Sequence, residues 1–251
     1  MKILWIGGWA MSWNAFLPEL LQAFPGHDHQ WLEWGDWISA IHSGTADPAA
    51  PIHGRSETAA SRLPGCHSAS DTLSDLLPST TPDLVVPWSQ GVQLLPYLHR
   101  RWVTEPARGF LLVAPALDFC RPGTGWRPQI LERMARALLQ EPAPVLREFA
   151  TNMGVPEPLR ERWLAGALKH PPSMLANGLR ALQHPTLLDN DCPLRILQGS
   201  DDWIALPAAV EQAAAPLPFC TFATASQAPH WLLDERLARP LQRLIDDAPT
   251  E

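Results

Sequence analysis

The chain has 251 residues, of which 46% are hydrophobic, and its formal net charge is -7. This size and apolar content suffice for one sizeable core and do not require a second full domain. The acidic balance and the lack of any lysine or arginine block argue against a nucleic-acid-binding protein, because phosphate neutralisation needs clustered cations.

The first apolar run, residues 3–6, ends at Gly7-Gly8. It is too short for the apolar region of a signal peptide, so we expect a buried strand there. No apolar stretch approaches the roughly 18 to 20 residues that a membrane-spanning helix needs. We therefore expect a cytoplasmic protein with no membrane partner.

Short apolar runs alternate with helical patterns, which is typical of an α/β protein with a mostly parallel sheet and helices on both faces. The expected strands are residues 3–6, 30–34, 84–87, 109–113 and 194–198, with a shorter sixth run at 219–222. Apolar residues at three- and four-residue spacing predict helices over residues 13–24, 208–215 and 232–245.

Two regions interrupt this alternation. Residues 42–70 are rich in Ser, Ala, Gly, Pro and His without periodicity, which predicts a loop. From residue 118 to about 185, helical patterns are broken by prolines and no strand pattern occurs. We therefore expect residues 118–186 to form a helical cap after the fourth predicted strand, between core segments 1–117 and 187–251.

A serine follows the predicted strand 84–87 at the start of a helical pattern, in the sequence Pro87-Trp88-Ser89-Gln90-Gly91. A nucleophile elbow holds its serine on such a strand-to-helix turn, with small residues two positions before and two after. Gly91 fits this pattern and Pro87 does not. The alternative is that Ser89 is an ordinary helix N-cap.

Two further candidates lie downstream. Asp201 and Asp202 follow Gly199 at the end of the strand 194–198, and His230 precedes the last predicted helix. A serine hydroxyl needs an imidazole to take its proton, and the imidazole needs a carboxylate to fix its tautomer. Nucleophile, acid and histidine occur here in the order found in α/β-hydrolases. The spacing alone leaves the acid open between the two aspartates.

The segment Gly7-Gly8-Trp9-Ala10-Met11 follows the first strand and precedes a helix. Backbone N–H groups in such a turn can stabilise an oxyanion, and we expect Trp9 and Gln90 to supply them. An ordinary strand-to-helix turn is the alternative. Four of the twelve tryptophans, Trp9, Trp88, Trp203 and Trp231, adjoin candidate residues and form either an apolar substrate wall or core filling.

The cysteines and histidines predict no further chemistry. The four cysteines contain no C-x-x-C pair, which favours free buried thiols: Cys66, Cys120, Cys192 and Cys220. His27-x-His29 lacks a third ligand at useful spacing. We expect neither a metal nor an organic cofactor.

Four stretches resemble the α/β-hydrolase superfamily, and more narrowly the pimeloyl-[acyl-carrier protein] methyl ester esterases of biotin synthesis. They are Gly8-Trp9-Ala10-Met11 with Trp13, Trp88-Ser89-Gln90-Gly91, residues 111–119 leading to Trp126-Arg127-Pro128, and residues 177–182. The resemblance implies an α/β-hydrolase fold with shortened N-terminal strands and a triad of Ser89, Asp202 and His230. Asp202 is selected because in that family the acid stands three residues after the glycine.

The resemblance also implies a substrate, namely the methyl ester of a pimeloyl chain carried on acyl-carrier protein, which is hydrolysed through an acyl-enzyme. In that family cap arginines hold the carrier, and Arg147 has the closest local match among the cap arginines Arg127, Arg133, Arg136, Arg147, Arg160 and Arg162. Solvated helix faces paired with glutamates are the alternative. Thioesterase, lactonase or acyltransferase activity, or a catalytically silent binding protein, are the other functions considered.

Overall fold

The computed structural model describes residues 1–13, 16–43, 73, 75–102, 107–186, 188 and 193–246. Six strands form one sheet in the order β2-β1-β3-β4-β5-β6, and every neighbouring pair is parallel. The strands are β1 (Lys2–Ile6), β2 (Asp28–Leu32), β3 (Leu84–Pro87), β4 (Gly109–Val113), β5 (Leu194–Gly199) and β6 (Cys220–Ala225).

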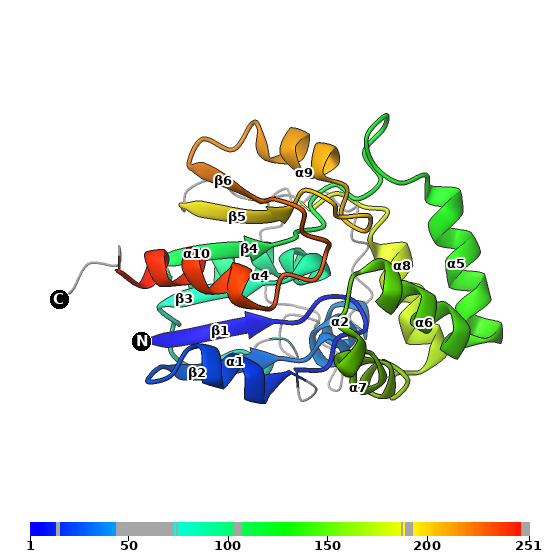
Figure 1. The fold of residues 1–251 in the computed structure, drawn as a ribbon, viewed down its shortest axis with the longest axis horizontal. Helices are drawn as coiled ribbons and strands as arrows, with labels where there is room; N and C mark the ends of the chain where they lie inside the picture. The colour runs from blue at the N-terminus through cyan, green and yellow to red at the C-terminus, as the bar shows by residue number, and fades with distance from the viewer. Residues whose placement is uncertain are drawn as a thin grey trace, which may run out of the picture.

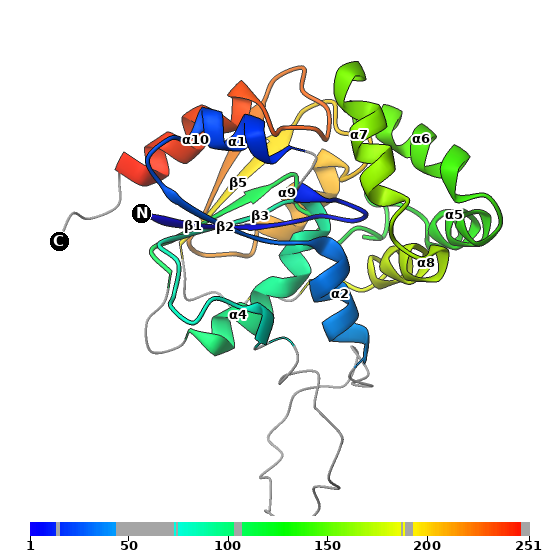
Figure 2. The ribbon, with the colours of Figure 1, turned by 90° about the horizontal axis from the view of Figure 1, so that it is seen from below.

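Helices cover both faces of this sheet. Helices α1 (Leu17–Ala23) and α10 (Glu235–Asp246) lie on one face, and α2 (Trp34–Ser43) and α4 (Leu95–Arg101) lie on the other (Figure 2). Strands β3 and β4 are buried along their whole length, as expected for inner strands of a parallel sheet. A further helix, α9 (Pro207–Ala214), connects β5 to β6.

Four helices lie between β4 and β5 in the chain: α5 (Pro128–Gln140), α6 (Pro142–Asn152), α7 (Glu157–Ala167) and α8 (Pro172–Ala181). We call α5 to α8 the cap helices. They gather at one end of the sheet (Figure 1), and residues 118–186 contain no strand. Each has a proline in its first turn, where no helical N–H bond is lost. The prolines that break the sequence pattern are therefore helix starts.

The two edge strands differ from the sequence prediction. β2 occupies residues 28–32 instead of 30–34, because its register runs from Lys2↔Asp28 to Ile6↔Leu32 and Trp34 already begins α2. β6 extends to Ala225 because it pairs with all of β5. Edge strands are half exposed, so backbone pairing sets their bounds and apolar runs do not mark them.

The predicted helices occur close to where the periodicity places them. The helix predicted over residues 13–24 is shorter and begins at Leu17, followed by Pro18 in its first turn. The loop predicted for residues 42–70 starts inside α2, which continues to Ser43, and residues 44–70 lie outside the described residues. In the described part of the chain, no helix combines the length and apolarity needed to cross a membrane.

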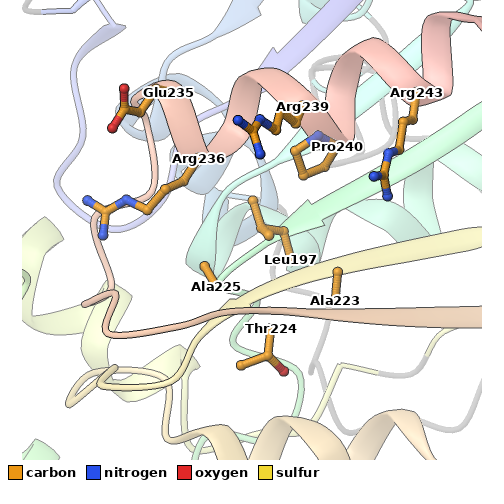
Figure 3. Close-up of a pocket in the computed structure, with 9 residues that line it drawn as sticks. All are labelled: Leu197, Ala223, Thr224, Ala225, Glu235, Arg236, Arg239, Pro240 and Arg243. Carbon is orange, nitrogen blue, oxygen red and sulfur yellow. The ribbon is translucent and has the colours of Figure 1, made fainter.

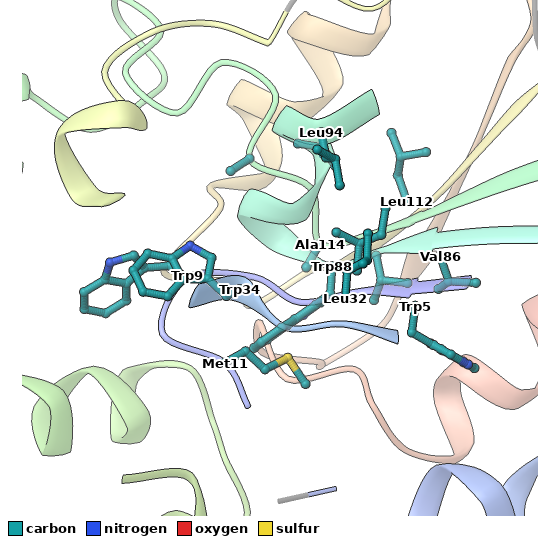
Figure 4. Close-up of a cluster of buried hydrophobic side chains, with 14 of the residues drawn as sticks. Trp5, Trp9, Met11, Leu32, Trp34, Val86, Trp88, Leu94, Leu112 and Ala114 are labelled. Carbon is teal, nitrogen blue, oxygen red and sulfur yellow. The ribbon is translucent and has the colours of Figure 1, made fainter. Parts of the chain in front are cut away.

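Tryptophans at the carboxyl end of β1 hold the loop that leaves this strand. Figure 4 shows Trp9 and Trp34 in the buried cluster that continues along the sheet. Trp37 Nε1 donates to the Gly7 carbonyl at 3.1 Å, and Trp13 Nε1 donates to the Leu32 carbonyl at 3.1 Å. These contacts anchor the segment that follows Ile6.

Candidate active site

Ser89 lies on a sharp turn between β3 and the 3-10 helix η2 (Ser89–Leu94). Its φ is +51°, a left-handed conformation that costs a non-glycine residue about 1 to 2 kcal/mol. A Cβ on Gly91 would lie 2.7 Å from the Ile6 carbonyl oxygen, and one on Gly8 would lie 2.9 Å from Ser89 Cβ. The backbone therefore packs as tightly around Ser89 as a nucleophile elbow requires.

Pro87 does not disturb this turn. The β3–β4 pairing covers Leu84 and Val85 and is interrupted at Val86 and Pro87. It resumes in the same register with the bridge Trp88↔Val113. Pro87 lies in the gap, where its missing N–H would face β4. On the other side, Trp88 N–H donates to the Ile6 carbonyl at 3.0 Å. The turn is thus held from β1.

His230 and Asp202 form a buried pair. His230 Nδ1 lies 2.8 Å from Asp202 Oδ2, and Asp202 is only 3% exposed. Asp202 Oδ1 accepts the N–H groups of Ile204 and Ala205 at 2.7 and 2.9 Å. Both carboxylate oxygens therefore hold fixed donors, and the imidazole is oriented by a group that cannot rotate freely.

Gln198 is a member of this cluster that the sequence analysis missed. It is fully buried on β5, and its Nε2 donates to Asp202 Oδ2 at 2.8 Å and to the Ala205 carbonyl at 2.9 Å. A polar residue at a buried position of the strand, four residues before the acid, is the signal that was available. A buried amide needs partners, and here the partner is Asp202.

The free nitrogen of His230 lies beside the elbow. Nε2 is buried and has no hydrogen-bond partner among the described residues. The ring of Trp88, the residue before Ser89, lies 5.3 Å from the His230 ring, centroid to centroid. The imidazole thus presents an unused acceptor or donor next to the serine turn, which is the group that proton transfer from a hydroxyl needs.

The two expected oxyanion residues are Gln90, which follows Ser89 in the chain, and Trp9, which belongs to the loop after β1. The first hydrogen bond of η2 runs from Gly91 N–H to the Trp88 carbonyl at 2.8 Å, so the N–H of Gln90 precedes the bonded turns. The Gly8-Trp9-Ala10 segment packs against Ser89 through Gly8, and Ala10 has a φ of +58°. Gln90 and the segment that holds Trp9 therefore both adjoin Ser89.

A cavity of about 500 Å³ opens at Ser89. Its walls come from the cap helices and from the loops after β1, β4 and β5, and most of the side chains are apolar: Trp9, Phe119, Trp126, Ile130, Leu131, Met134, Ala137, Val145, Phe149, Leu179, Leu182, Trp203 and Ile204, with the polar Arg133, Glu148 and Asn152. Its size and lining suit an apolar ligand of medium length.

The expected substrate residues separate into two groups. Trp9 and Trp203 line the cavity, and Trp203 is 70% exposed. Trp88 and Trp231 are 1% exposed and pack against each other in the core, with ring centroids 5.7 Å apart. Arg147 is exposed on α6 and is not among the lining residues, whereas Arg133 of α5 is. For the two arginines, the face of the cap helix on which each one lies decides whether it lines the cavity.

A second cavity, of about 530 Å³, lies between α10 and the strands β5 and β6. Its cationic wall consists of Arg236, Arg239 and Arg243, while Ala223 and Ala225 project toward the helix from β6 (Figure 3). None of the candidate catalytic residues lines it. Ser89 lines the cavity under the cap helices, whereas Asp202 and His230 are not among its lining residues.

The described cysteines lie outside the candidate constellation. Cys120 and Cys220 are free and half-buried, and Cys66 and Cys192 lie outside the described residues. Burial, together with the negative charge of Asp118, raises the pKa of the Cys120 thiol to about 11. A thiol with so little thiolate at neutral pH is a poor nucleophile.

No protein-family model matches the sequence, and no curated protein matches it as a relative. Solved structures do match. The esterase EaEST from Exiguobacterium antarcticum aligns over 100% of this chain and 92% of its own, with a TM-score of 0.68 at 13% identity. The hydrolase olei00960 from Oleispira antarctica aligns over 98% and 91%, with a TM-score of 0.68 at 13% identity.

BioG from Haemophilus influenzae aligns over 92% of this chain and 89% of its own, with a TM-score of 0.55 at 16% identity. The protein has the α/β-hydrolase fold. The expected fold class is thereby confirmed, with a parallel sheet, helices on both faces and a helical segment after the fourth strand. In the α/β-hydrolase fold, Ser89 follows β3, Asp202 follows β5 and His230 follows β6, so all three candidates lie beyond the carboxyl ends of parallel strands.

Proposed function

We propose that this protein is a serine carboxylester hydrolase whose catalytic triad is Ser89, Asp202 and His230. The observation that carries the proposal is the buried Nδ1–Oδ2 contact of 2.8 Å between His230 and Asp202, with the opposite imidazole nitrogen unused beside the strained Ser89 turn. A cavity with apolar walls opens at the same serine. No cofactor is required by this chemistry.

The proposed reaction begins with attack of Ser89 Oγ on the ester carbonyl carbon while His230 Nε2 takes the hydroxyl proton. The carbonyl oxygen becomes an oxyanion, which the N–H groups of Trp9 and Gln90 stabilise. Collapse of the tetrahedral intermediate breaks the bond to the alcohol, and His230 returns the proton to this leaving group. An acyl-Ser89 ester remains.

Water then repeats the sequence on the acyl-enzyme. His230 takes a proton from the water as its oxygen bonds to the acyl carbon, and returns a proton to Ser89 Oγ as the carboxylic acid leaves. Asp202 keeps the Nδ1–H of His230 directed at its own Oδ2, so that Nε2 is the nitrogen that exchanges protons. The imidazolium formed in each step is stabilised by this carboxylate.

For the substrate, we propose an acyl ester of medium length, specifically the methyl ester of a pimeloyl-type chain on acyl-carrier protein. The cavity of about 500 Å³ and its apolar walls support a medium acyl chain. The sequence resemblance supports the carrier, and the cap arginines Arg127, Arg133 and Arg147 have no acidic partner among the described residues. Free cations suit an acidic carrier surface.

The other cap arginines are less available. Arg162 pairs with Glu19, Arg160 Nε donates to the Val155 carbonyl at 2.8 Å, and Arg136 lies 3.9 Å from Glu132. The expectation of glutamate-paired cap helix faces therefore holds for Arg136, whereas Arg162 pairs with Glu19 of α1, outside the cap. The partner and the cytoplasmic location remain predictions.

Replacing Ser89 or His230 by alanine tests the proposed reaction. Each variant is expected to lose about 10⁴ to 10⁶ in kcat for a p-nitrophenyl ester, because triad members act as a unit. Ser200→Ala is a matched control, since Ser200 is an exposed serine next to the aspartates. A fluorophosphonate should label Ser89 alone, and near-normal turnover by Ser89→Ala would overturn the proposal.

The carrier is tested by reversing two of the arginines that have no acidic partner in the described part of the chain, Arg127→Glu with Arg147→Glu, neither of which lines the cavity. KM for an acyl-carrier-protein ester should rise, with a loss that shrinks at high salt, while a free methyl ester is unaffected. The control is Arg239→Glu with Arg243→Glu on α10, which changes the charge equally at the other cavity. If the control pair has the same effect, only net charge matters and the docking assignment fails.

A further inference from the structure

The two residues expected to stabilise the oxyanion hold the same cap helix through their side chains. Trp9 Nε1 donates to the Leu175 carbonyl of α8 at 2.9 Å. Gln90 Nε2 donates to the Gly178 carbonyl of α8 at 2.7 Å. The two carbonyls are three residues apart, so they lie on one face of the helix about one turn from each other.

The Gln90 contact satisfies a group that α8 cannot satisfy itself. The last four carbonyls of a helix lack intrahelical donors, and in α8 these include Gly178 and Ala181. The N–H of Leu182 bonds to the Arg180 and Leu179 carbonyls, so Gly178 takes its donor from Gln90. Gln93 Nε2 also donates to the Ala181 carbonyl, at 3.0 Å, and the N–H of His184 reaches the same carbonyl at 3.2 Å. The 3-10 helix η2 therefore caps the end of α8.

The Gln90 amide is locked on its other side as well. It is 0% exposed, its Oε1 accepts Trp34 Nε1 at 2.8 Å, and its Nε2 also reaches Gln93 Oε1 at 3.0 Å. A buried amide with all these partners has a single orientation. Its backbone, which carries the oxyanion N–H, is fixed with it.

The backbone of α8 also touches the indoles directly. A Cβ on Gly178 would lie 2.4 Å from Trp34 Cζ2 and 2.8 Å from Trp9 Cδ1. Figure 4 shows these two indoles side by side. Any side chain at residue 178 would push α8 away from both rings and from Gln90.

We propose that α8 acts as a template for the oxyanion hole, with Trp9 and Gln90 serving as positioning residues through their side chains. The inference rests on the proposed function, in which the N–H groups of these residues bind the oxyanion. The turn around Trp9 contains a left-handed Ala10 and a single local hydrogen bond, from Met11 N–H to the Gly8 carbonyl. Contacts with other segments therefore set the geometry of this turn, and α8 supplies one of these contacts.

Two substitutions remove the side-chain contacts and leave both backbone N–H groups. Gln90→Met has a similar length but neither donates to Gly178 nor accepts from Trp34. Trp9→Phe loses the donor to Leu175 together with part of the ring that packs against Phe149. Removing an oxyanion donor outright costs about 10² to 10³ in kcat, so misplacing one is expected to cost about 10- to 100-fold with little change in KM.

Arg180→Met is the matched control, because it removes the contacts of the same helix to Glu132 of α5 and leaves the partners of Trp9 and Gln90 in place. It should keep kcat within about tenfold of the wild type, a barrier change below 1.4 kcal/mol. Affinity for a trifluoromethyl ketone, which forms a tetrahedral oxyanion adduct on serine, should fall in Gln90→Met and Trp9→Phe in parallel with kcat. A ground-state product acid should bind as before.

The outcomes separate this inference from the proposed function. If Ser89→Ala abolishes turnover while Gln90→Met and Trp9→Phe keep wild-type kcat and ketone affinity, the template role of α8 is wrong and the triad stands. Equal losses in Arg180→Met would reduce the effect to cap stability and also overturn it. If Gln90→Met fails to fold by circular dichroism, Trp9→Phe alone decides the question.

Discussion

Asp201 and Asp202 are neighbours in the chain but lie in opposite environments. Asp202 is buried against His230, while Asp201 is exposed and accepts Ser200 Oγ at 2.9 Å. The exposed carboxylate belongs to the turn that Ser200 and Gln227 complete, with Gln227 N–H donating to Ser200 Oγ at 2.8 Å. Two adjacent positions in the chain are therefore a turn residue, Asp201, and the acid candidate, Asp202.

Asp202→Asn is expected to lower kcat by about 10⁴, because an amide facing Nδ1 favours the wrong tautomer of His230. Asp201→Asn should retain nearly all activity, since its hydroxyl contact survives in an amide. Both variants are compared by kcat on the same p-nitrophenyl ester. A reversed order of damage would move the acid role to Asp201.

At the scale of single elements, β3 shows how a parallel sheet accommodates a proline before its functional turn. Pro87 occupies the register position opposite Ile6 of β1, yet no β3–β4 pairing is formed at that residue. The following residue restores contact with both neighbours, through Trp88 N–H to Ile6 and the bridge to Val113. The strained serine therefore stands on a strand end fixed from two sides.

Pro87→Ala is accordingly expected to keep kcat within about tenfold of the wild type, that is, within 1.36 kcal/mol of barrier height. Gly91→Ala is the contrasting variant, because its Cβ would meet the Ile6 carbonyl oxygen at 2.7 Å and displace the turn. Steady-state kinetics on both variants decides the matter. A severe loss in Pro87→Ala would show that the proline itself shapes the elbow.

At the scale of the molecule, the cap helices are joined to the core at several buried points. Within the cap, Arg180 of α8 pairs with Glu132 of α5 at 2.9 Å, and between cap and core the carbonyl of Met153 accepts the N–H of Trp231 at 2.8 Å. The loop between α7 and α8 meets the core at Gly35, where a Cβ would lie 2.6 Å from His170 Cε1. This histidine also packs edge-on against Trp34, with ring centroids 5.1 Å apart.

Burial lowers the pKa of His170 below its ordinary value of 6.5, Lys169 acts in the same direction, and Asp36 opposes the shift. Below about pH 6.5 the unfolded chain therefore binds a proton that the folded protein resists, so stability falls as the pH falls. His170→Gln removes this contribution. Between pH 7.5 and 5.5 its urea midpoint should decline less than that of the wild type, and an equal decline would contradict the prediction.

Much of this organisation follows from the sequence because it depends on local patterns. Apolar runs mark the inner strands β1, β3, β4 and β5, since most of their side chains are buried. The order of Ser89, Asp202 and His230, each after a strand, predicts the candidate site because the carboxyl ends of parallel strands meet at one edge.

The tertiary structure decides what depends on contacts between distant segments. The bounds of β2 and β6 come from pairing, because half-exposed edge strands lack a continuous apolar run. The division of the tryptophans between cavity and core depends on how the loops after the strands fold, because Trp88 and Trp231 pack against each other from distant parts of the chain. Gln198 and Gln90 acquire their roles because buried amides must find partners, and those partners lie 4 and 88 residues away in the chain.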